Sequence, residues 1–285
     1  MQYLSTEKFA GGALAVANHV SNFCDNVGML TILGEHASQE DFVKQHVNSN
    51  VDKMFIHKAD SPTIVKRRFV EGYLLQKLFE VYEMNDEELN QEQDSALCAR
   101  LEEVIPKYDL AIVVDYGHGM LTNRAITILT KKAPFLTVNT QANAANKGFN
   151  TISKYPRADY VCLAQHEIEL EERNRNGDIR EMILDLSGKV TCGKITITRS
   201  KRGNICYSES EGFVETPAIT EQVVDRMGAG DAVLSLTSLC VAQQAPMAVV
   251  GFIGNIVGAQ AVATLGHKTS IDRTLLFKSI DTLLK

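Results

Sequence analysis

The chain has 285 residues, of which 45% are hydrophobic and 22% charged, enough for one large core or a core with a smaller appendage. A formal net charge of −6 argues against binding nucleic acid or an anionic membrane by bulk charge. The six cysteines include no CxxC pair, which predicts free thiols in a reducing compartment rather than a disulfide framework or a zinc site.

The N-terminal residues and the overall hydropathy predict a soluble, cytoplasmic protein. The sequence starts MQYLSTEKFAGG, without the charged region and apolar segment of a signal peptide. No run of about 18 apolar residues occurs, so no membrane span is expected. We expect neither a membrane nor a nucleic acid among the partners.

Short apolar runs rich in β-branched residues alternate with helical patterns along the chain. The runs predict strands at 27–33, 110–115, 135–139, 158–163 and 194–199. Helical patterns cover 11–23, 85–105, 123–133 and 179–188, and the chain from 228 to 285 is mostly helical. The acidic helix near 86–103 is expected to present a solvated face. This order predicts a parallel sheet covered by helices on both faces.

The segment 52–82 interrupts that order. It alternates basic and apolar residues around turn residues, which is typical of strands exposed on one face, at a sheet edge or in a small flap. No repeat or linker is present. We therefore expect residues 1–285 to form a single domain, with lid-like strands at about 52–82.

The stretch 225–239, DRMGAGDAVLSLTSL, places two glycines and an acid before an apolar run that predicts a helix starting near Ala229. The first amides of such a helix have no internal partner, so they suit a phosphoryl group that gains charge. Asp231, in the first turn, could accept the proton of a substrate hydroxyl. A simpler interpretation is a turn at Gly228 and Gly230, with Asp231 only favouring the helix start.

DRMGAGD followed by a helix resembles the C-terminal signature of the ribokinase (PfkB-type) carbohydrate kinases, which is close to D-T-x-G-A-G-D. The resemblance implies a ribokinase-like α/β fold with a small β flap or lid. It also implies that Asp231 is the catalytic base and that the amides of Gly228, Ala229 and Gly230 form an anion hole. Asp225 takes the place of the opening aspartate, and Arg226 stands where threonine is usual.

The resemblance extends to the acceptor side of the site. GGALAVANHV at 11–20 looks like the family's di-glycine element, which implies that Gly11 and Gly12 lie against the sugar. TIVKRRFVEGYLLQKLFE and VVDYGHGML look most like the kinase half of bifunctional ADP-heptose synthases. Asp115 ends a strand and is expected to face the ligand crevice. His118 replaces a lysine, and both a substrate-binding and a structural role are open for it.

Three further segments resemble the metal and nucleotide regions of the family. ADYVCLAQHEIEL corresponds to an N-x-x-E segment, which implies that Glu167 helps to organise magnesium through water. TRSKRGNICY implies that Thr198, Arg199 and Gly203 approach the nucleotide, and GFIGNIVGAQAVATLG places Asn255 beside the adenine. ATP and Mg²⁺ are the cofactors that this resemblance implies.

The sequence departs from the family pattern at several positions. Ala15 and Ala164 stand where asparagines are usual. The family normally begins with a strand that carries a sugar-binding aspartate, and this sequence begins after that region. Comparison with the length of βαβ units suggests that about forty residues are missing. We therefore expect a fragment with an incomplete lid and substrate site.

Two polar segments allow more than one interpretation. The loop after residue 139 carries five amide side chains at a strand end, where ligands bind in α/β sheets, but these amides could equally satisfy their own turns. They are Asn139, Gln141, Asn143, Asn146 and Asn150. Lys66, Arg67 and Arg68 could bind a sugar phosphate or lie on a solvated strand face.

The combined prediction is a kinase that transfers the γ-phosphoryl group of ATP to a hydroxyl of a sugar or sugar phosphate. The resemblance makes a heptose phosphate the first acceptor to consider, and it implies a nucleotidyltransferase domain fused in the full gene. A homodimer through the lid strands is a further implication. The alternatives are a catalytically weakened binding or scaffolding module derived from such a kinase, and a kinase for a nucleoside or vitamin. The acceptor, the oligomeric state and activation by potassium are left open.

Overall fold

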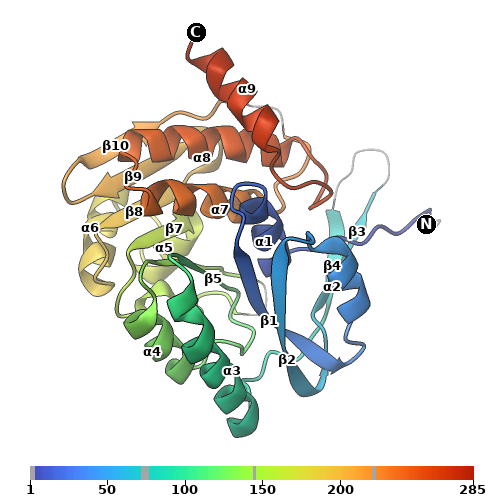
Figure 1. Cartoon of the computed structure of the whole chain (residues 1–285). Helices are drawn as coiled ribbons and strands as arrows, with labels where there is room; N and C mark the ends of the chain where they lie inside the picture. The colour runs from blue at the N-terminus through green and yellow to red at the C-terminus, as the bar shows by residue number, and fades with distance from the viewer. Residues whose placement is uncertain (1–3, 72–76, 144–145, 220–222) are drawn as a thin grey trace.

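The computed structural model describes residues 4–71, 77–143, 146–219 and 223–285, in which helices and strands alternate through the middle of the chain (Figure 1). The helices are α1 (Ala13–Ser21), α2 (Glu40–His46), α3 (Gln91–Val104), α4 (Asn123–Lys132), α5 (Gln165–Glu171), α6 (Ile179–Lys189), α7 (Ala229–Ala242), α8 (Met247–Val262) and α9 (Arg273–Leu283). The strands are β1 (Val27–His36), β2 (Val51–Pro62), β3 (Val65–Val70), β4 (Lys77–Glu83), β5 (Ala111–Asp115), β6 (Leu136–Thr140), β7 (Tyr160–Ala164), β8 (Lys194–Thr198), β9 (Asn204–Ser208) and β10 (Gly212–Thr216).

The largest sheet has six strands in the order β10-β9-β8-β7-β6-β5. Strands β5 to β8 run parallel, and β9 and β10 continue the sheet as an antiparallel pair. The predicted strands at 110–115, 135–139, 158–163 and 194–199 are confirmed here. Because the carboxyl ends of parallel strands share one edge, Asp115 and Thr140 end their strands side by side.

Alternate residues of the central strands point to opposite helix layers, as strand geometry requires. On β7, Val161 and Leu163 pack in the core cluster that contains residues of α3, α4 and α6, whereas Tyr160 and Cys162 pack with residues of α7 and α8. The expected cover on both faces is therefore confirmed (Figure 1). The acidic helix α3 is solvated on one face only, since Leu97 and Leu101 are buried.

The predicted lid region at 52–82 divides into two structures. Strand β2 pairs in parallel with β1, and its residues Val51, Met54 and Lys58 are buried. Strands β3 and β4 form an antiparallel hairpin, which stands beside the body of the protein (Figure 1). The strands exposed on one face are thus those of the hairpin, and part of the predicted region, 72–76, lies outside the described residues.

Strand β1 lies between the same two helix layers as β5. Met29 and Leu33 pack with α1 and with Ile112 and Val114 of β5, whereas Leu30 packs on the opposite cluster. Within the described residues, β1 pairs only with β2, and β5 pairs only with β6. That the family's first strand is missing from this sequence stays a prediction.

Two general expectations concern thiols and membranes. All six cysteines are free, and four of them are buried. Within the described part of the chain, no helix is both long enough and apolar enough to cross a membrane.

Candidate active site

Helix α7 begins at Ala229, where the sequence predicts it, and the glycine before it makes this start sharp. Gly228 adopts the left-handed conformation (φ 74°, ψ −3°), which glycine reaches without the steric cost that a side chain brings. The amides of Gly230 and Asp231 donate no hydrogen bond to the described residues. The start of the helix therefore presents free donors at the positive end of its dipole.

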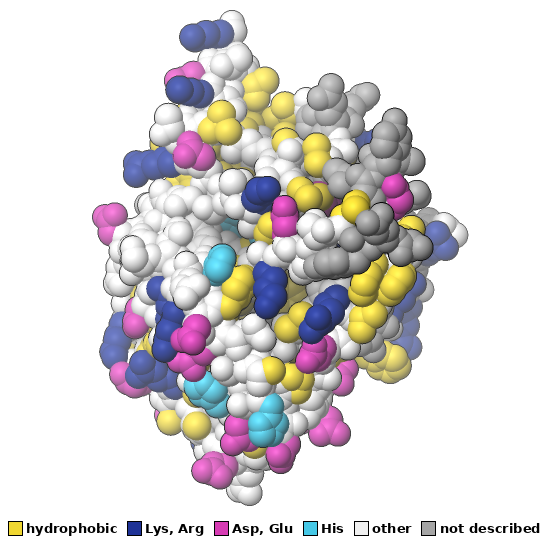
Figure 2. Space-filling model, turned by 90° about the vertical axis from the view of Figure 1, so that its right-hand side faces the viewer, with side chains coloured by type: hydrophobic (Ala, Val, Ile, Leu, Met, Phe, Trp, Pro, Cys, Tyr) yellow, Lys and Arg dark blue, Asp and Glu magenta, His cyan; other side chains and the backbone are white. Residues whose placement is uncertain are grey.

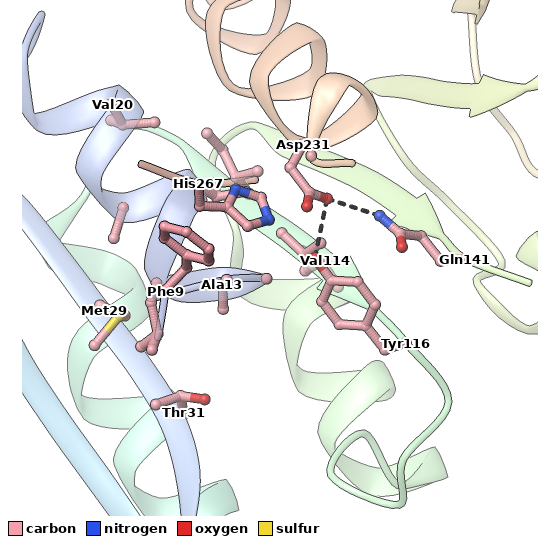
Figure 3. Close-up of a pocket in the computed structure, with 18 of the residues that line it drawn as sticks. Phe9, Ala13, Val20, Met29, Thr31, Val114, Tyr116, Gln141, Asp231 and His267 are labelled. Carbon is pink, nitrogen blue, oxygen red and sulfur yellow. Dashed lines mark hydrogen bonds between the residues drawn. The ribbon is translucent and has the colours of Figure 1, made fainter. Parts of the chain in front are cut away.

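Asp231 lies in this first turn, 6% exposed, with one carboxylate oxygen held from two strand ends. The Tyr116 hydroxyl donates to Oδ1 at 2.9 Å, and Gln141 Nε2 donates to the same oxygen at 2.7 Å (Figure 3). Tyr116 directly follows β5, and Gln141 directly follows β6. Oδ2 accepts no hydrogen bond from the described residues, so this oxygen is free to accept a proton from a ligand.

Burial raises the pKa of Asp231 because the charged form loses its hydration. Nearby His267 opposes this rise, as do the hydrogen bonds from Tyr116 and Gln141 and the charge of Lys66. Burial, together with the Asp231 carboxylate, raises the pKa of the Tyr116 hydroxyl well above its ordinary value, so this hydroxyl stays a donor. Asp231 is thus a base whose proton affinity is set by a few named neighbours.

The polar loop after β6 holds the turn that carries Tyr116. Asn143 Nδ2 and Asn146 Nδ2 donate to the Tyr116 carbonyl oxygen at 2.8 and 2.6 Å, and Asn150 Nδ2 donates to the Asp115 carbonyl oxygen at 2.8 Å. Of the two interpretations of this loop, the structure favours amides that satisfy backbone turns. Residues 144–145 lie outside the described residues.

Asp115 and His118 flank Tyr116 in this turn and differ in their contacts. The Asp115 carboxylate accepts hydrogen bonds from the Gly117 amide, the Tyr155 hydroxyl and Lys154 Nζ at 2.6–2.9 Å, so it is already engaged within the protein. His118 is buried, and neither of its ring nitrogens has a hydrogen-bond partner in the described structure. Burial, with a smaller contribution from Lys66, lowers its pKa to about 4. His118 is therefore a neutral group with unused polar atoms.

A cavity of about 2600 Å³ joins these residues to the glycine pair and the hairpin. Gly11, Gly12, Asp115, His118, Gly228 and Asp231 all line it, as do Lys66 and Arg68. Gly12 has a positive φ (61°), and a side chain there would meet the Tyr116 ring at 3.3 Å. The structure therefore brings together the predicted acceptor residues and the predicted base.

The hairpin adds positive charge to this cavity. Lys66 Nζ lies 5.6 Å from the centre of the Tyr116 ring and 5.1 Å from that of Tyr82, and Arg68 pairs with Glu80. Burial lowers the pKa of Lys66. The right-hand side of Figure 1, turned to the viewer in Figure 2, shows hydrophobic side chains among lysines and arginines. Lys66 is thus a half-buried cation inside the cavity, in contrast to the exposed Arg67.

Glu167 lies in the first turn of α5, and its carboxylate accepts two backbone hydrogen bonds. Oε2 accepts from the Ala164 amide at 2.7 Å and Oε1 from the Ala142 amide at 3.3 Å. Burial raises the pKa of Glu167 to about 7, and the negative charge of Asp231 contributes to the rise. The two acids therefore lie close enough to repel one another, which is an environment that suits a cation.

The residues predicted for the nucleotide gather around the end of β10. Arg199 pairs with Glu215 at 2.8 Å, and Asn255 Nδ2 donates to the carbonyl oxygens of Thr216 and Pro217 at 3.1 and 2.9 Å. A side chain at Gly203 would come within 1.9 Å of the Thr216 carbonyl oxygen, so Gly203 lies close to that backbone. Thr198 ends β8, which is separated from β10 by β9. Their contact with a nucleotide stays a prediction.

Two residues of the site carried no role in the sequence interpretation: Tyr116 and His267. Tyr116 directly follows a parallel strand, so the rule that ligands bind at strand ends, which had marked Gln141 as one of five candidate amides, could have identified it as well. His267 lies in the turn after α8 and approaches Asp231 only through the tertiary fold, so no local signal marks it.

The family comparison covers almost the whole chain: the model described as "pfkB family carbohydrate kinase" matches residues 4–274. Among curated proteins, the bifunctional protein HldE of Haemophilus influenzae is 24% identical over 268 residues, which are 92% of this chain and 54% of that protein. HldE of Azotobacter vinelandii is 25% identical over 263 residues, with 91% and 53% covered. The chain thus spans about half the length of these relatives.

Solved structures share the fold at low sequence identity. The tetrameric inhibited form of phosphofructokinase-2 from Escherichia coli has a TM-score of 0.77 and 14% identity, covering 98% of this chain and 93% of that one. Ribokinase from Thermotoga maritima has a TM-score of 0.70 and 14% identity, covering 94% and 85%. The ribokinase-like α/β fold predicted from the sequence is confirmed.

Proposed function

Because the chain belongs to the pfkB family of carbohydrate kinases, we propose that it transfers the γ-phosphoryl group of ATP to a hydroxyl of a sugar or sugar phosphate. The observation that carries this proposal is the position of Asp231. Tyr116 and Gln141 fix one oxygen of its carboxylate, and the other oxygen has no partner among the described residues. A base held in this way can take a proton without changing its own orientation.

The acceptor hydroxyl gives its proton to Asp231 Oδ2 as its oxygen forms a bond to the γ-phosphorus, and the bond between that phosphorus and the β,γ-bridging oxygen breaks to release ADP. The amides of Gly228 and Gly230, which have no partner among the described residues, donate to the phosphoryl oxygens on which charge develops. The third predicted amide, that of Ala229, already donates to the Arg226 carbonyl oxygen at 3.4 Å. The left-handed Gly228 has no side chain of its own at this helix end, and the His267 ring packs against it instead.

A magnesium ion fits the acidic side of this site. Glu167 and Asp231 repel one another electrostatically, and each has carboxylate lone pairs beyond those used in the protein. Glu167 would hold the ion through water, and the ion would supply charge neutralisation to the phosphate oxygens. Thr198, Arg199, Gly203 and Asn255 are the residues that we propose for the nucleotide.

For the acceptor, we propose a phosphorylated sugar, with a heptose phosphate as the first candidate. The cavity that holds the base also holds Lys66, half-buried between two tyrosine rings, and Arg68. Cations in this position suit an acceptor that carries its own phosphate. The similarity to the bifunctional HldE proteins supports a heptose among such sugars.

A catalytically weakened module derived from such a kinase is the alternative function. Ala15 and Ala164, in place of two asparagines, favour it. The geometry of the GAGD turn opposes it, because a scaffold has no need for a buried acid with one free oxygen beside free helix amides. The geometry therefore supports the kinase better.

The test is ADP release by the natural gene product with ATP, Mg²⁺ and a panel of sugars and sugar phosphates. We expect turnover with a phosphorylated sugar and a loss of about 10³-fold or more in kcat for Asp231→Asn, since general-base catalysis contributes roughly 10²–10⁴-fold. Asp281→Asn, the same change on the exposed face of α9, is the matched control and should keep full activity. Equal rates for wild type and Asp231→Asn would show that Asp231 is not the base.

A further inference from the structure

His118, on the turn after β5, lines the cavity with polar atoms that the protein leaves unused. It is 8% exposed, and neither ring nitrogen has a hydrogen-bond partner among the described residues. His19, the other buried histidine of the described chain, differs, because its Nδ1 accepts a hydrogen bond from the Ile271 amide at 3.0 Å. A buried polar group without a partner destabilises a fold, so a ligand that completes it gains affinity.

The backbone on either side of His118 is fixed by two glycines. Gly117 and Gly119 have positive φ angles of 67° and 79°, which glycine adopts without steric cost. A side chain at Gly119 would come within 1.9 Å of the Glu87 carbonyl oxygen, and one at Gly117 within 2.2 Å of Asn146 Nδ2. The turn therefore lies tightly between two other segments, which keeps His118 at a fixed place on the cavity wall.

The charged neighbours of His118 come from four parts of the chain: Lys58 on β2, Lys66 on β3, Asp86 before α3 and Asp115 at the end of β5. The two lysines lower its pKa and the two acids raise it, while burial, the largest cause, brings it to about 4. None of the four forms a hydrogen bond with the ring in the described structure. At neutral pH the imidazole is therefore uncharged, with one nitrogen that donates and one that accepts.

Tyr116 is a neighbour of both this imidazole and the proposed base. Its ring lies 6.4 Å from that of His118 and is nearly parallel to it, at 10°, and its hydroxyl donates to Asp231 (Figure 3). His118 and Asp231 line the same cavity. A half-turn of the imidazole about its Cβ–Cγ bond exchanges ring nitrogens with ring carbons, and no hydrogen bond has to break for it. The ring can therefore turn a nitrogen toward a ligand in the cavity.

Given the proposed kinase function, on which this inference rests, we propose that His118 determines acceptor specificity by a hydrogen bond between its imidazole and an acceptor hydroxyl other than the one that is phosphorylated. His118 stands where the resembling sequences carry a lysine. A lysine ammonium only donates and attracts anions, whereas an uncharged imidazole donates one hydrogen bond and accepts another. A hydroxyl can do both as well. The acceptor is thus a sugar phosphate that presents a hydroxylated, uncharged part to this turn and its phosphate to Lys66 and Arg68 of the hairpin.

The kinetic test uses the natural gene product with three sugar phosphates: glucose 6-phosphate, mannose 6-phosphate and sedoheptulose 7-phosphate. For the best of them we expect His118→Ala to lower kcat/KM roughly 10- to 100-fold, mainly through the KM of the acceptor, with the KM of ATP unchanged. One single-deoxy analogue of this acceptor should lose a similar factor in wild type and nothing further in His118→Ala. His36→Ala, at the exposed end of β1, is the matched control and should keep full activity.

A second variant tests specificity directly. His118→Lys adds a charge at this wall, so it should change the order of preference among the three sugar phosphates. A side chain that only packs would lower the activity with all three by one common factor when it is changed. Such a uniform loss, or a deoxy analogue that loses as much in His118→Ala as in wild type, overturns the inference.

A spectroscopic test needs no turnover. Histidine labelled with ¹⁵N on the ring shows which nitrogen carries the proton, and His118→Gln assigns the signal among the seven histidines. The His118 signals should not titrate between pH 6 and pH 8. Saturating sedoheptulose 7-phosphate should shift them, whereas inorganic phosphate, an anion without a sugar, should not. His118 signals that stay unchanged while other signals report sugar binding would overturn the proposal, as would an ordinary histidine titration.

The outcomes separate this inference from the proposed function. If no sugar or sugar phosphate is turned over and none shifts any signal, the proposed function fails and the role of His118 fails with it. If turnover is found but depends on His118 by one common factor for every acceptor, the kinase function stands and only the specificity role is lost. Should thermal unfolding show that His118→Ala does not fold, His118→Asn replaces it, and the wild-type NMR titration with sugar phosphate decides.

Discussion

The hydroxyl of Tyr116 provides a direct test of how the site controls its base. Tyr116→Phe keeps the ring that packs on Gly12 and removes only the hydrogen bond to Asp231 Oδ1. A hydrogen bond to a charged group is worth about 1.5–3 kcal/mol, and this one favours the ionised carboxylate. Its loss should lower the activity by roughly 10- to 150-fold at a pH where the variant's Asp231 is mostly protonated, since 1.36 kcal/mol corresponds to tenfold.

The sign of the pH dependence distinguishes this effect from general damage. The hydrogen bond lowers the pKa of Asp231, so its removal raises that pKa, and the variant needs a higher pH to ionise its base. We therefore expect the acid limb of kcat against pH to move upward and the activity to recover at alkaline pH. Steady-state ADP release between pH 5.5 and 9 measures this profile, with saturating ATP and acceptor.

The hairpin offers a matched control for the same chemical change. Tyr82 donates to Glu80 Oε2 at 2.9 Å, the same length as the bond from Tyr116 to Asp231. Tyr82→Phe keeps the ring that lies against Lys66, and we expect it to change kcat by less than about threefold because that bond is partly exposed. A Tyr116→Phe profile that falls equally at every pH, or one that overlays wild type, would refute the reasoning.

Two further predictions concern stability. Gly203→Ala should lower the free energy of unfolding by about 2–5 kcal/mol in urea denaturation, since the added Cβ lies 1.9 Å from the Thr216 carbonyl oxygen and φ is 75°. The control Gly212→Ala, with φ 72° and no atom within 4 Å of the added Cβ, should lower it by only about 1–2 kcal/mol. Equal losses in the two variants would contradict the close contact at Gly203. Burial raises the pKa of Glu167 from its ordinary value of 4.5 to about 7, so the folded state binds this proton more tightly than the unfolded state does. The free energy of unfolding should therefore fall as pH rises from 4.5 to 7. The unfolding free energy of wild type minus that of Glu167→Gln should decrease between pH 5 and pH 8, and a constant value would contradict the assignment.

The sequence predicted the local elements well, because their signals are local. The β-branched runs 135–139 and 158–163 became β6 and β7, and the break at Gly228 placed the start of α7 at Ala229. Asp231 could be identified from the same stretch, since a helix start and an acid in its first turn are encoded within a few residues.

The contacts of that acid could not be predicted in the same way. Tyr116 and Gln141 are separated from Asp231 by 115 and 90 residues, so only the order of strands in the sheet brings them together. The same limit explains the segment 52–82, where alternation identified strands but not their partners. Strand β2 joined β1 in parallel, whereas β3 and β4 paired with one another. Asp115 shows a second limit, because a strand-end acid can be engaged by its own turn and by Tyr155 rather than by a ligand.

The two sides of Asp231 differ in a way that bears on catalysis. On one side, Tyr116 and Gln141 bind Oδ1, and asparagine side chains of the neighbouring loop hold the Tyr116 carbonyl oxygen. That side has a defined hydrogen-bond network and orients the carboxylate. His267 lies beside Asp231 away from Gln141 (Figure 3), and both His267 and Lys66 influence Asp231 through charge without a hydrogen bond among the described residues. Because Tyr116 and Gln141 both bind Oδ1, an acceptor can approach Oδ2 without disturbing the orientation of the carboxylate, and removing the Tyr116 hydroxyl should change the pH at which the base works.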